Sequence, residues 1–294
     1  MPHPLALVIA MFAAAITSAS AAEIDWSKLD QAFGKPGGIQ PGGVHKWGLP
    51  RTDLKITVDG IQLKPTFALG SWVAFMPMGS EAMLMGDLVL TDDEVSPVMQ
   101  RLIDGGVEIS AVHNHLLRTT PAVFYMHVGG HGDPARIAET LRAGLALSHT
   151  PMGAPVAGPP APVDLDAAAL DAAIGFKGTA NGGVLQYSIP RAEAITDAGM
   201  AVPPSLGTAI AINFQPLGGG RAAITGDFIL VGSEVKPVLK TLRDSGIEIT
   251  ALHSHMINDS PHMLFMHFWA TDDAIVLARK LRAALDRTNI KRTS

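Results

Sequence analysis

Several short stretches of the chain alternate apolar and polar residues, or run apolar for a few positions, and these stretches predict strands. Three of them are rich in β-branched and aromatic residues and occupy residues 53–61, 66–79 and 81–91. Residues 92–106 then change to the spacing of one helical face, with acidic residues in the first turn. The apolar positions of this predicted helix are Val95, Val98, Met99 and Leu102.

Two further strands and a closing helix complete the segment. We expect the strands over residues 107–116 and 122–128. Asp133 suits the N-cap of the closing helix, and Pro134 suits its first position. Strands and helices in this order predict an α+β fold, with an antiparallel sheet and two helices packed on one face.

The segment occurs twice in the chain. A shift of 140 residues places residues 43–51 on 183–191, residues 86–98 on 226–238, and residues 104–115 on 244–255. This period is too long for a solenoid, so it indicates two tandem homologous domains, which we expect to be related by pseudo-twofold symmetry. The expected boundaries are 1–22 for a signal peptide, 23–148 for the first repeat domain, 149–163 for a Pro/Gly/Ala-rich linker and 164–288 for the second repeat domain.

Composition narrows the class of protein. The chain has 294 residues, is 47% hydrophobic and carries a formal net charge of −5. It is therefore globular and lacks the basic balance typical of nucleic-acid binding, so nucleic acid is not an expected partner. The absence of cysteine excludes disulfides, thiolate metal ligands and a lipid-bearing cysteine.

The N-terminus predicts export. Leu5–Ile16 is an apolar run of signal-peptide length, and the small residues after it place cleavage near Ala21 or Ala22. Against export, the residues before this run include His3 but no Lys or Arg. No later stretch has the length of an apolar membrane span, so we expect no transmembrane segment and a periplasmic or secreted location.

Each repeat carries the same histidine pattern, two histidines one residue apart and a third after eleven more residues. The two sets are His113, His115 and His127, and His253, His255 and His267. Because strand residues alternate faces, the first two histidines of each set should point the same way. The third joins them only if the register of the hairpin has an even residue sum.

The same alternation places other side chains. Ile249 and Ala251 share a face with His253, which predicts that the histidines extend the apolar face of the strand. Glu108 and Glu248 fall on the opposite face unless a bulge intervenes.

Three imidazoles on one face suit a divalent transition metal, with zinc or copper favoured. We therefore predict one three-histidine metal site in each repeat, with an open position where water or a small ligand binds, as in a metal-dependent enzyme of unnamed substrate. The candidates for orienting these ligands are Asp87, Glu108, Asp227 and Glu248. Methionines in the first repeat also suit copper(I), but the second repeat lacks them, which favours core packing; they are Met76, Met78, Met83 and Met85.

A second class of function stays open. In it the protein is a non-enzymatic module that binds a small ligand or associates with the envelope, and its histidines are structural or respond to pH. The histidine spacing names no catalytic residue, substrate or oligomeric state.

The repeated GD…L…EV.PV…G.E..A.H.H…P….MH pattern resembles the LppY/LpqO family, bacterial exported proteins and lipoproteins with a duplicated domain of unknown function. The resemblance spans about Glu23 to Leu285. It implies an exported bacterial protein, and a soluble periplasmic form because this chain lacks the cysteine that bears the lipid. The family implies no activity or cofactor.

Overall fold

The computed structural model describes residues 23–153 and 161–292. The expected signal peptide, residues 1–22, lies outside the described residues, as do residues 154–160 of the expected linker. Within the described residues, no helix is both long and apolar enough to cross a membrane.

The first half is an antiparallel six-stranded sheet with the strand order β1-β2-β5-β6-β8-β7. Its strands are β1 (Gly38–Gln40), β2 (Val44–Pro50), β5 (Gly70–Met78), β6 (Glu81–Thr91), β7 (Glu108–His113) and β8 (Val123–Gly132). Its helices are α1 (Trp26–Phe33), α3 (Asp92–Asp104) and α4 (Pro134–Leu145). Smaller elements are the 3-10 turn η1 (Pro41–Gly43), β3 (Thr57–Val58), β4 (Ile61–Gln62) and α2 (Pro65–Ala68).

The second half repeats this arrangement with the strand order β15-β17-β14-β13-β10-β9. Its strands are β9 (Thr179–Asn181), β10 (Val184–Pro190), β13 (Ala209–Gly218), β14 (Arg221–Val231), β15 (Glu248–His253) and β17 (Met263–Asp273). Its helices are α5 (Ala167–Ile174), α6 (Gly232–Asp244) and α7 (Ala274–Leu285). Smaller elements are β11 (Thr196–Asp197), β12 (Met200–Ala201), the 3-10 turn η2 (Pro204–Leu206) and β16 (Asp259–Ser260). The expected α+β fold with two homologous halves is confirmed.

Local sequence explains where the helices begin. In α3, the Glu94 carboxylate accepts a hydrogen bond from the Thr91 backbone N–H at 2.9 Å, which closes a capping box. Asp133 caps α4 as expected, accepting from the Ala135 N–H at 2.9 Å. The helices α1 and α5 are additions to the two expected per half. The carboxylates of Asp25 and Asp166 cap their first turns.

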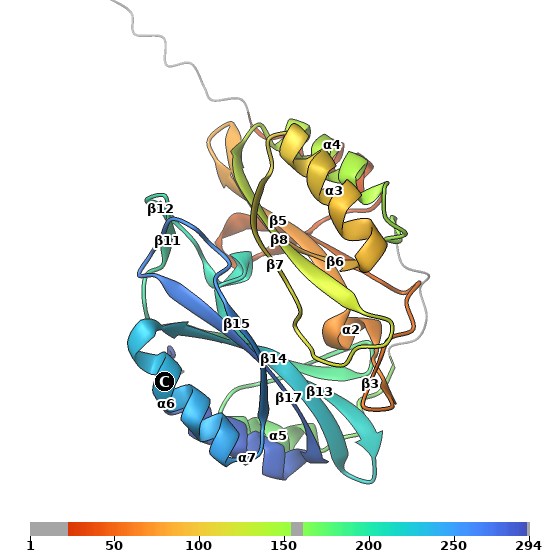
Figure 1. The fold of residues 1–294 in the computed structure, drawn as a ribbon. Coiled ribbons are helices and arrows are strands. Elements are labelled where there is room, and N and C mark those ends of the chain that lie inside the picture. Colours follow the sequence, from red (N-terminus) through yellow and green to blue (C-terminus); the bar gives the residue numbers. More distant parts are fainter. Residues whose placement is uncertain (1–22, 154–160, 293–294) are drawn as a thin grey trace, which may run out of the picture.

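The two sheets face each other, and the helices lie outside them (Figure 1). On β6, Leu84 and Leu88 pack under α3 and α4 in the core of the first half. The alternate residues Met83 and Met85 point the other way and share a buried cluster with side chains of the second half. These methionines fill an apolar interface, in agreement with the core-packing interpretation.

Polar contacts also join the halves. The Gln215 side chain accepts from the Lys64 backbone N–H at 2.8 Å and donates to the Gln62 carbonyl at 2.9 Å. At the surface, Arg118 of the first half pairs with Glu248 of the second at 2.7 Å. The two halves therefore form one continuous structure with a shared interior.

A β-bulge interrupts each histidine-bearing strand. On β7 the pairing with β8 shifts between Ile109 and Ala111, so Ser110 is the extra residue. On β15 the same shift occurs between Ile249 and Ala251, around Thr250. A bulge changes which residues share a face, so it decides where the histidines point.

Candidate metal centre

The bulges turn the histidines toward the opposite half. Past the bulge, Ala251 pairs with His267 and His253 pairs with Phe265, whereas Ile249 pairs with Phe268 under the helices. The prediction that the histidines extend the apolar face of Ile249 is therefore wrong, because the bulge reverses the alternation. The even register that brings the third histidine to the same face is present, since His113 pairs with Tyr125, two residues from His127.

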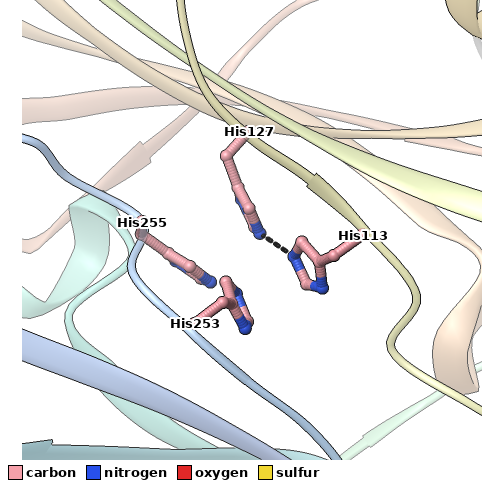
Figure 2. A group of neighbouring side chains, drawn as sticks. All are labelled: His113, His127, His253 and His255. Atoms are coloured by element: carbon pink, nitrogen blue, oxygen red, sulfur yellow. Dashed lines mark hydrogen bonds between the residues drawn. The ribbon is translucent and has the colours of Figure 1, made fainter.

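All six histidines of the repeated pattern meet between the halves. In each half, the first lies at the end of β7 or β15, the second in the loop after it, and the third on β8 or β17. Figure 2 shows four of them, His113 and His127 from one half facing His253 and His255 from the other.

The rings form three close pairs across the interface. The ring centroids of His113 and His253, which occupy equivalent positions of the repeat, lie 3.6 Å apart. His115 lies 3.8 Å from His267, and His127 lies 3.7 Å from His255. The last two pairs are exchanged by the pseudo-twofold symmetry, so the histidine cluster (His113, His115, His127, His253, His255 and His267) has the symmetry of the whole fold.

Backbone carbonyls fix the tautomers of several rings. A carbonyl oxygen only accepts hydrogen bonds, so the His267 Nδ1 that lies 2.9 Å from the Gly226 oxygen must carry the proton. The same argument holds for His113 Nδ1, which lies 3.1 Å from the Asn114 oxygen. The Gly86 carbonyl is hydrogen-bonded to His127 in the equivalent way. The Nε2 atoms of these neutral rings therefore carry lone pairs, the arrangement that metal-ligating histidines show.

Two of these lone pairs face each other. His113 Nε2 and His127 Nε2 are 2.8 Å apart (Figure 2). The Nδ1 protons of both rings are already used by backbone carbonyls. Facing lone pairs repel each other unless a cation or a proton lies between them. Ligand nitrogens of one zinc ion lie about 3 Å apart, since each Zn–N bond is about 2.0–2.1 Å long.

Buried polar atoms without a hydrogen-bond partner gather in this one place. Within the described residues, all such side-chain atoms belong to four of the six histidines and to Asp87 and Asp227. They are Nε2 of His115, His253, His255 and His267, Nδ1 of His253, and Oδ1 of both aspartates. Because leaving a buried polar group unpaired costs about 1–3 kcal/mol, this gathering makes the cluster a candidate binding site.

Burial keeps the six imidazoles neutral. It lowers the pKa of every histidine in the cluster, to about 2 for His253 and about 3 for His267, and the neighbouring rings lower most of these pKa values further. The neutral imidazole is the form that binds metal. Burial also raises the pKa of Asp87 and Asp227 well above the ordinary range.

The ligand atoms divide into two related groups. His113, His115 and His267 place ligand atoms within 4.8 Å of one another, and so do His113, His127, His253 and His255. We call the first group, His113, His115 and His267, the first centre. We call His127, His253 and His255 the second centre, and His113 also has a ligand atom within 4.8 Å of theirs. The sequence predicts one three-histidine site in each half. The structure instead combines the His-x-His pair of one half with the third histidine of the other.

The two aspartates lie where an orienting carboxylate is expected. Asp87 pairs with His127 across the β6–β8 ladder, and its Oδ2 lies 3.5 Å from His115 Nε2. Asp227 has the same position beside His267, with its Oδ2 at 3.7 Å from His255 Nε2. Each aspartate forms a further possible metal-binding group with the second and third histidines of its own half. The Nδ1 protons of those third histidines are held by carbonyls, which favours the centres that use Nε2.

The two glutamates have other surroundings. Glu248 pairs with Arg118 of the first half rather than with a histidine. Glu108 is exposed, and no hydrogen bond joins it to a histidine of the cluster. The structure therefore gives these residues no contact through which they would orient a ligand.

Sequence reasoning missed the residues that hold the second histidine of each set. The Ser110 hydroxyl donates to the His255 carbonyl, and the Thr250 hydroxyl donates to the His115 carbonyl. Tyr125 stacks on the His115 ring with centroids 3.4 Å apart, and Phe265 stacks on His255 at 3.5 Å. The signal was present, because both repeats keep a hydroxyl residue at the bulge and an aromatic residue two positions before the third histidine.

The two repeats also define the family. The chain belongs to the family described as a domain of unknown function, DUF1259, whose model matches residues 27–147 and 168–287. No curated protein matches the chain.

Two solved structures show a distant similarity. The trimeric bacterial microcompartment shell protein PduB is 14% identical over 84% of this chain and 88% of its own, with a TM-score of 0.20. EtuB from Clostridium kluyveri is 10% identical over 85% of this chain and 88% of its own, also with a TM-score of 0.20. A similarity at that TM-score carries no argument about this protein.

Proposed function

We propose that the protein binds transition-metal ions, zinc or copper, at the first and second centres between its halves. The observation that carries this proposal is the gathering of unpartnered ring nitrogens and carboxylate oxygens, all buried, around neutral imidazoles. Ligand sets of nitrogen without thiolate suit zinc and copper, and this chain has no cysteine.

The proposed location is the bacterial periplasm. The support is the apolar run Leu5–Ile16, the small residues near Ala21 and Ala22, and the resemblance to the exported LppY/LpqO family. Mass measurement of the mature protein from a periplasmic extract tests this proposal. A chain that keeps its first residues and stays in the cytosol contradicts it.

Three histidines leave room for a further ligand on a metal ion. A bound ion there would polarise a water molecule or a small ligand, so the site suits either metal-dependent catalysis or reversible binding. Aromatic side chains shield the site from water, because Tyr125 and Phe265 cover one side of the second histidine of each set. The two aspartates approach it from β6 and β14.

Elemental analysis of protein purified without a histidine tag tests the metal proposal directly. Wild-type protein should hold stoichiometric metal, and the double variant His113→Ala/His253→Ala should lose it. His131→Ala is the matched control, because this exposed histidine pairs with Glu81 outside the cluster. Metal content that is equal in all three proteins contradicts the proposal.

A second candidate function is a non-enzymatic module in which the histidines respond to pH or bond a ligand directly. The 2.8 Å contact between His113 Nε2 and His127 Nε2 favours direct bonding, because one proton between these nitrogens would form a hydrogen bond without a metal. If metal-free wild-type protein has the same fold and the same ligand affinity as the metal-loaded protein, the result would support this module over the metal site.

A further inference from the structure

A cavity of about 560 Å³ lies between the halves, beside the histidine cluster. Its walls come from β2 and β5 of the first half and from β10 and β13 of the second. Its lining also includes His115, His255 and both aspartates. This volume is typical of a site for a small organic molecule, and the metal centres alone do not account for it.

One wall of the cavity presents a cation without a counter-ion. Lys46 on β2 is half-buried, and its Nζ lies 3.9 Å from the centroid of the Trp72 ring. Among the described residues, no side chain forms an ion pair or hydrogen bond with this ammonium, although the Asp87 charge attracts it from a distance. Burial lowers the pKa of Lys46 to about 8, so most molecules still carry the charge at neutral pH.

The other wall presents an amide with free donors. Gln186 Nε2 donates to the Asn213 Oδ1 at 3.1 Å and to the Thr66 carbonyl at 2.8 Å, while its own oxygen accepts from Asn181. This network fixes the orientation of the Asn213 amide, because the flipped amide would set two donors against each other. The Asn213 NH2 group is left without a partner among the described residues.

The residues that line the cavity do not follow the pseudo-twofold symmetry, whereas the six histidines of the cluster do. Lys46 and Gln186 are equivalent positions in the two sheets. Each lies two residues before the residue whose partner on the neighbouring strand pairs with an aspartate. Trp72 and Ala211 are equivalent because each pairs with an aspartate. Ala74 and Asn213 are equivalent because they pair with Lys46 and Gln186. The wall from the first half is therefore cationic, and the wall from the second half presents an uncharged donor.

We propose that this cavity binds a small organic carboxylate, with its anionic group at Lys46 and its oxygen-rich body between Asn213 and the histidine cluster. The proposal deepens the metal-binding function and rests on it for one anchor, a metal ion in the first or second centre. The Lys46 and Asn213 contacts do not depend on that ion.

The lining favours a carboxylate over two other kinds of ligand. Among the described residues, no arginine lines the cavity, and one ammonium without a cradle of backbone N–H groups is a weak set for phosphate. Lys46 already covers the face of Trp72, so this ring is not free to stack on a sugar.

Isothermal titration with malate, citrate and gluconate tests the proposal, with glucose and inorganic phosphate as comparison ligands. The proteins are zinc-treated wild type, Lys46→Gln and Asn213→Ala, each variant copying the residue at the aligned position of the other half. Lys55→Gln is the matched control, because Lys55 is exposed and lies outside the cavity. The zinc content of each protein is measured in parallel.

At least one carboxylate should bind the wild type and the control with equal affinity. Lys46→Gln should weaken this binding about tenfold or more, because a hydrogen bond to a charged group contributes about 1.5–3 kcal/mol. Asn213→Ala should weaken it by a smaller factor, and zinc content should stay unchanged in all variants.

Three results overturn the proposal: no carboxylate binds, Lys46→Gln binds as tightly as the wild type, or phosphate or glucose binds as well as the carboxylates. Zinc-treated wild type that takes up no zinc but still binds a carboxylate through Lys46 would refute the metal centres and support the cavity site. The two failures are therefore distinguishable.

Discussion

The imidazole rings of His113 and His253 lie with their centroids 3.6 Å apart, although the two residues belong to different repeats. They occupy equivalent positions, so the pseudo-twofold axis passes between them. The axis exchanges the other two close pairs of the cluster, His115 with His267 and His255 with His127. The site consequently depends on how the halves dock as well as on how each half folds.

Metal-free protein should lose stability as the pH falls below about 6.5, the ordinary pKa of histidine. The folded state holds the pKa of His253 at about 2 and that of His267 at about 3 because both rings are buried. In this range the unfolded chain binds more protons than the folded chain. The stabilisation is therefore complete above about pH 6.5 and is lost progressively toward the folded pKa values.

Urea unfolding of metal-free protein between about pH 7.5 and about pH 5 measures this effect. Each buried histidine should contribute a slope of about 1.4 kcal/mol per pH unit. The variant His253→Ala should have a shallower slope than the wild type by about that amount. Equal slopes for the two proteins would show that His253 is not held neutral by burial.

Gly226→Ala should destabilise the protein by about 1–3 kcal/mol, the usual cost of overpacking. A Cβ at Gly226 would lie 2.0 Å from the Ala211 carbonyl oxygen, and the backbone of β13 would have to move. The carbonyl of Gly226 also holds the His267 ring, so metal content should fall as well.

Gly232→Ala is the matched control for this substitution. Gly232 begins α6, and a Cβ there meets no atom within 4 Å. Its thermal unfolding should match the wild type or improve on it, because alanine favours helix more than glycine does. Equal unfolding of Gly226→Ala and Gly232→Ala would contradict the tight approach of β13 to β14.

The sequence predicts much of each half and the pseudo-twofold relation between the halves, but not which side chains meet across the interface. The helix over residues 92–106, the Asp133 cap and the paired strands all follow from local periodicity and capping, which act between near neighbours. The even register of the third histidine was identified as the condition for a shared face, and the pairing of His113 with Tyr125 meets it.

The bulges and the docking of the halves explain the rest. Simple alternation puts Ile249 and His253 on one face, and the extra residue Thr250 undoes that alternation. No local pattern shows that the Thr250 hydroxyl binds the backbone of His115, because that contact joins residues of different repeats. Exchange of the third histidine between the halves is likewise a property of tertiary packing.

Glu94→Ala should destabilise the protein by about 3–5 kcal/mol, because it leaves the buried Arg51 guanidinium with less than its full set of partners. Arg51 Nη1 donates to Glu94 Oε2 at 2.7 Å, and neither side chain is exposed. The exposed pair of Lys240 and Asp244 is the control, and Asp244→Ala should leave the free energy of unfolding nearly unchanged. Chemical denaturation measures both changes.

The pH dependence of this difference gives an independent check. Burial by itself would raise the pKa of Glu94, but hydrogen bonds from Arg51 and the backbone outweigh it and lower the pKa to about 2. Because the folded state lowers the pKa of Glu94, its ionised carboxylate stabilises the protein at pH values above about 4.3, the ordinary pKa of glutamate. This contribution is lost as the pH falls toward 2. The difference in free energy of unfolding between wild type and Glu94→Ala should therefore become smaller in that pH range. A difference that stays constant would contradict the ion pair.

Counting metal ions in two double variants tests the central claim most directly, that each centre takes histidines from both halves. His115 and His267 belong to the first centre, whereas His115 and His127 belong to different centres. We predict that His115→Ala/His267→Ala keeps the ion of the second centre and that His115→Ala/His127→Ala keeps neither ion. The reverse result, with an ion retained only when His115 and His127 are removed together, would contradict shared centres and restore one separate site per half.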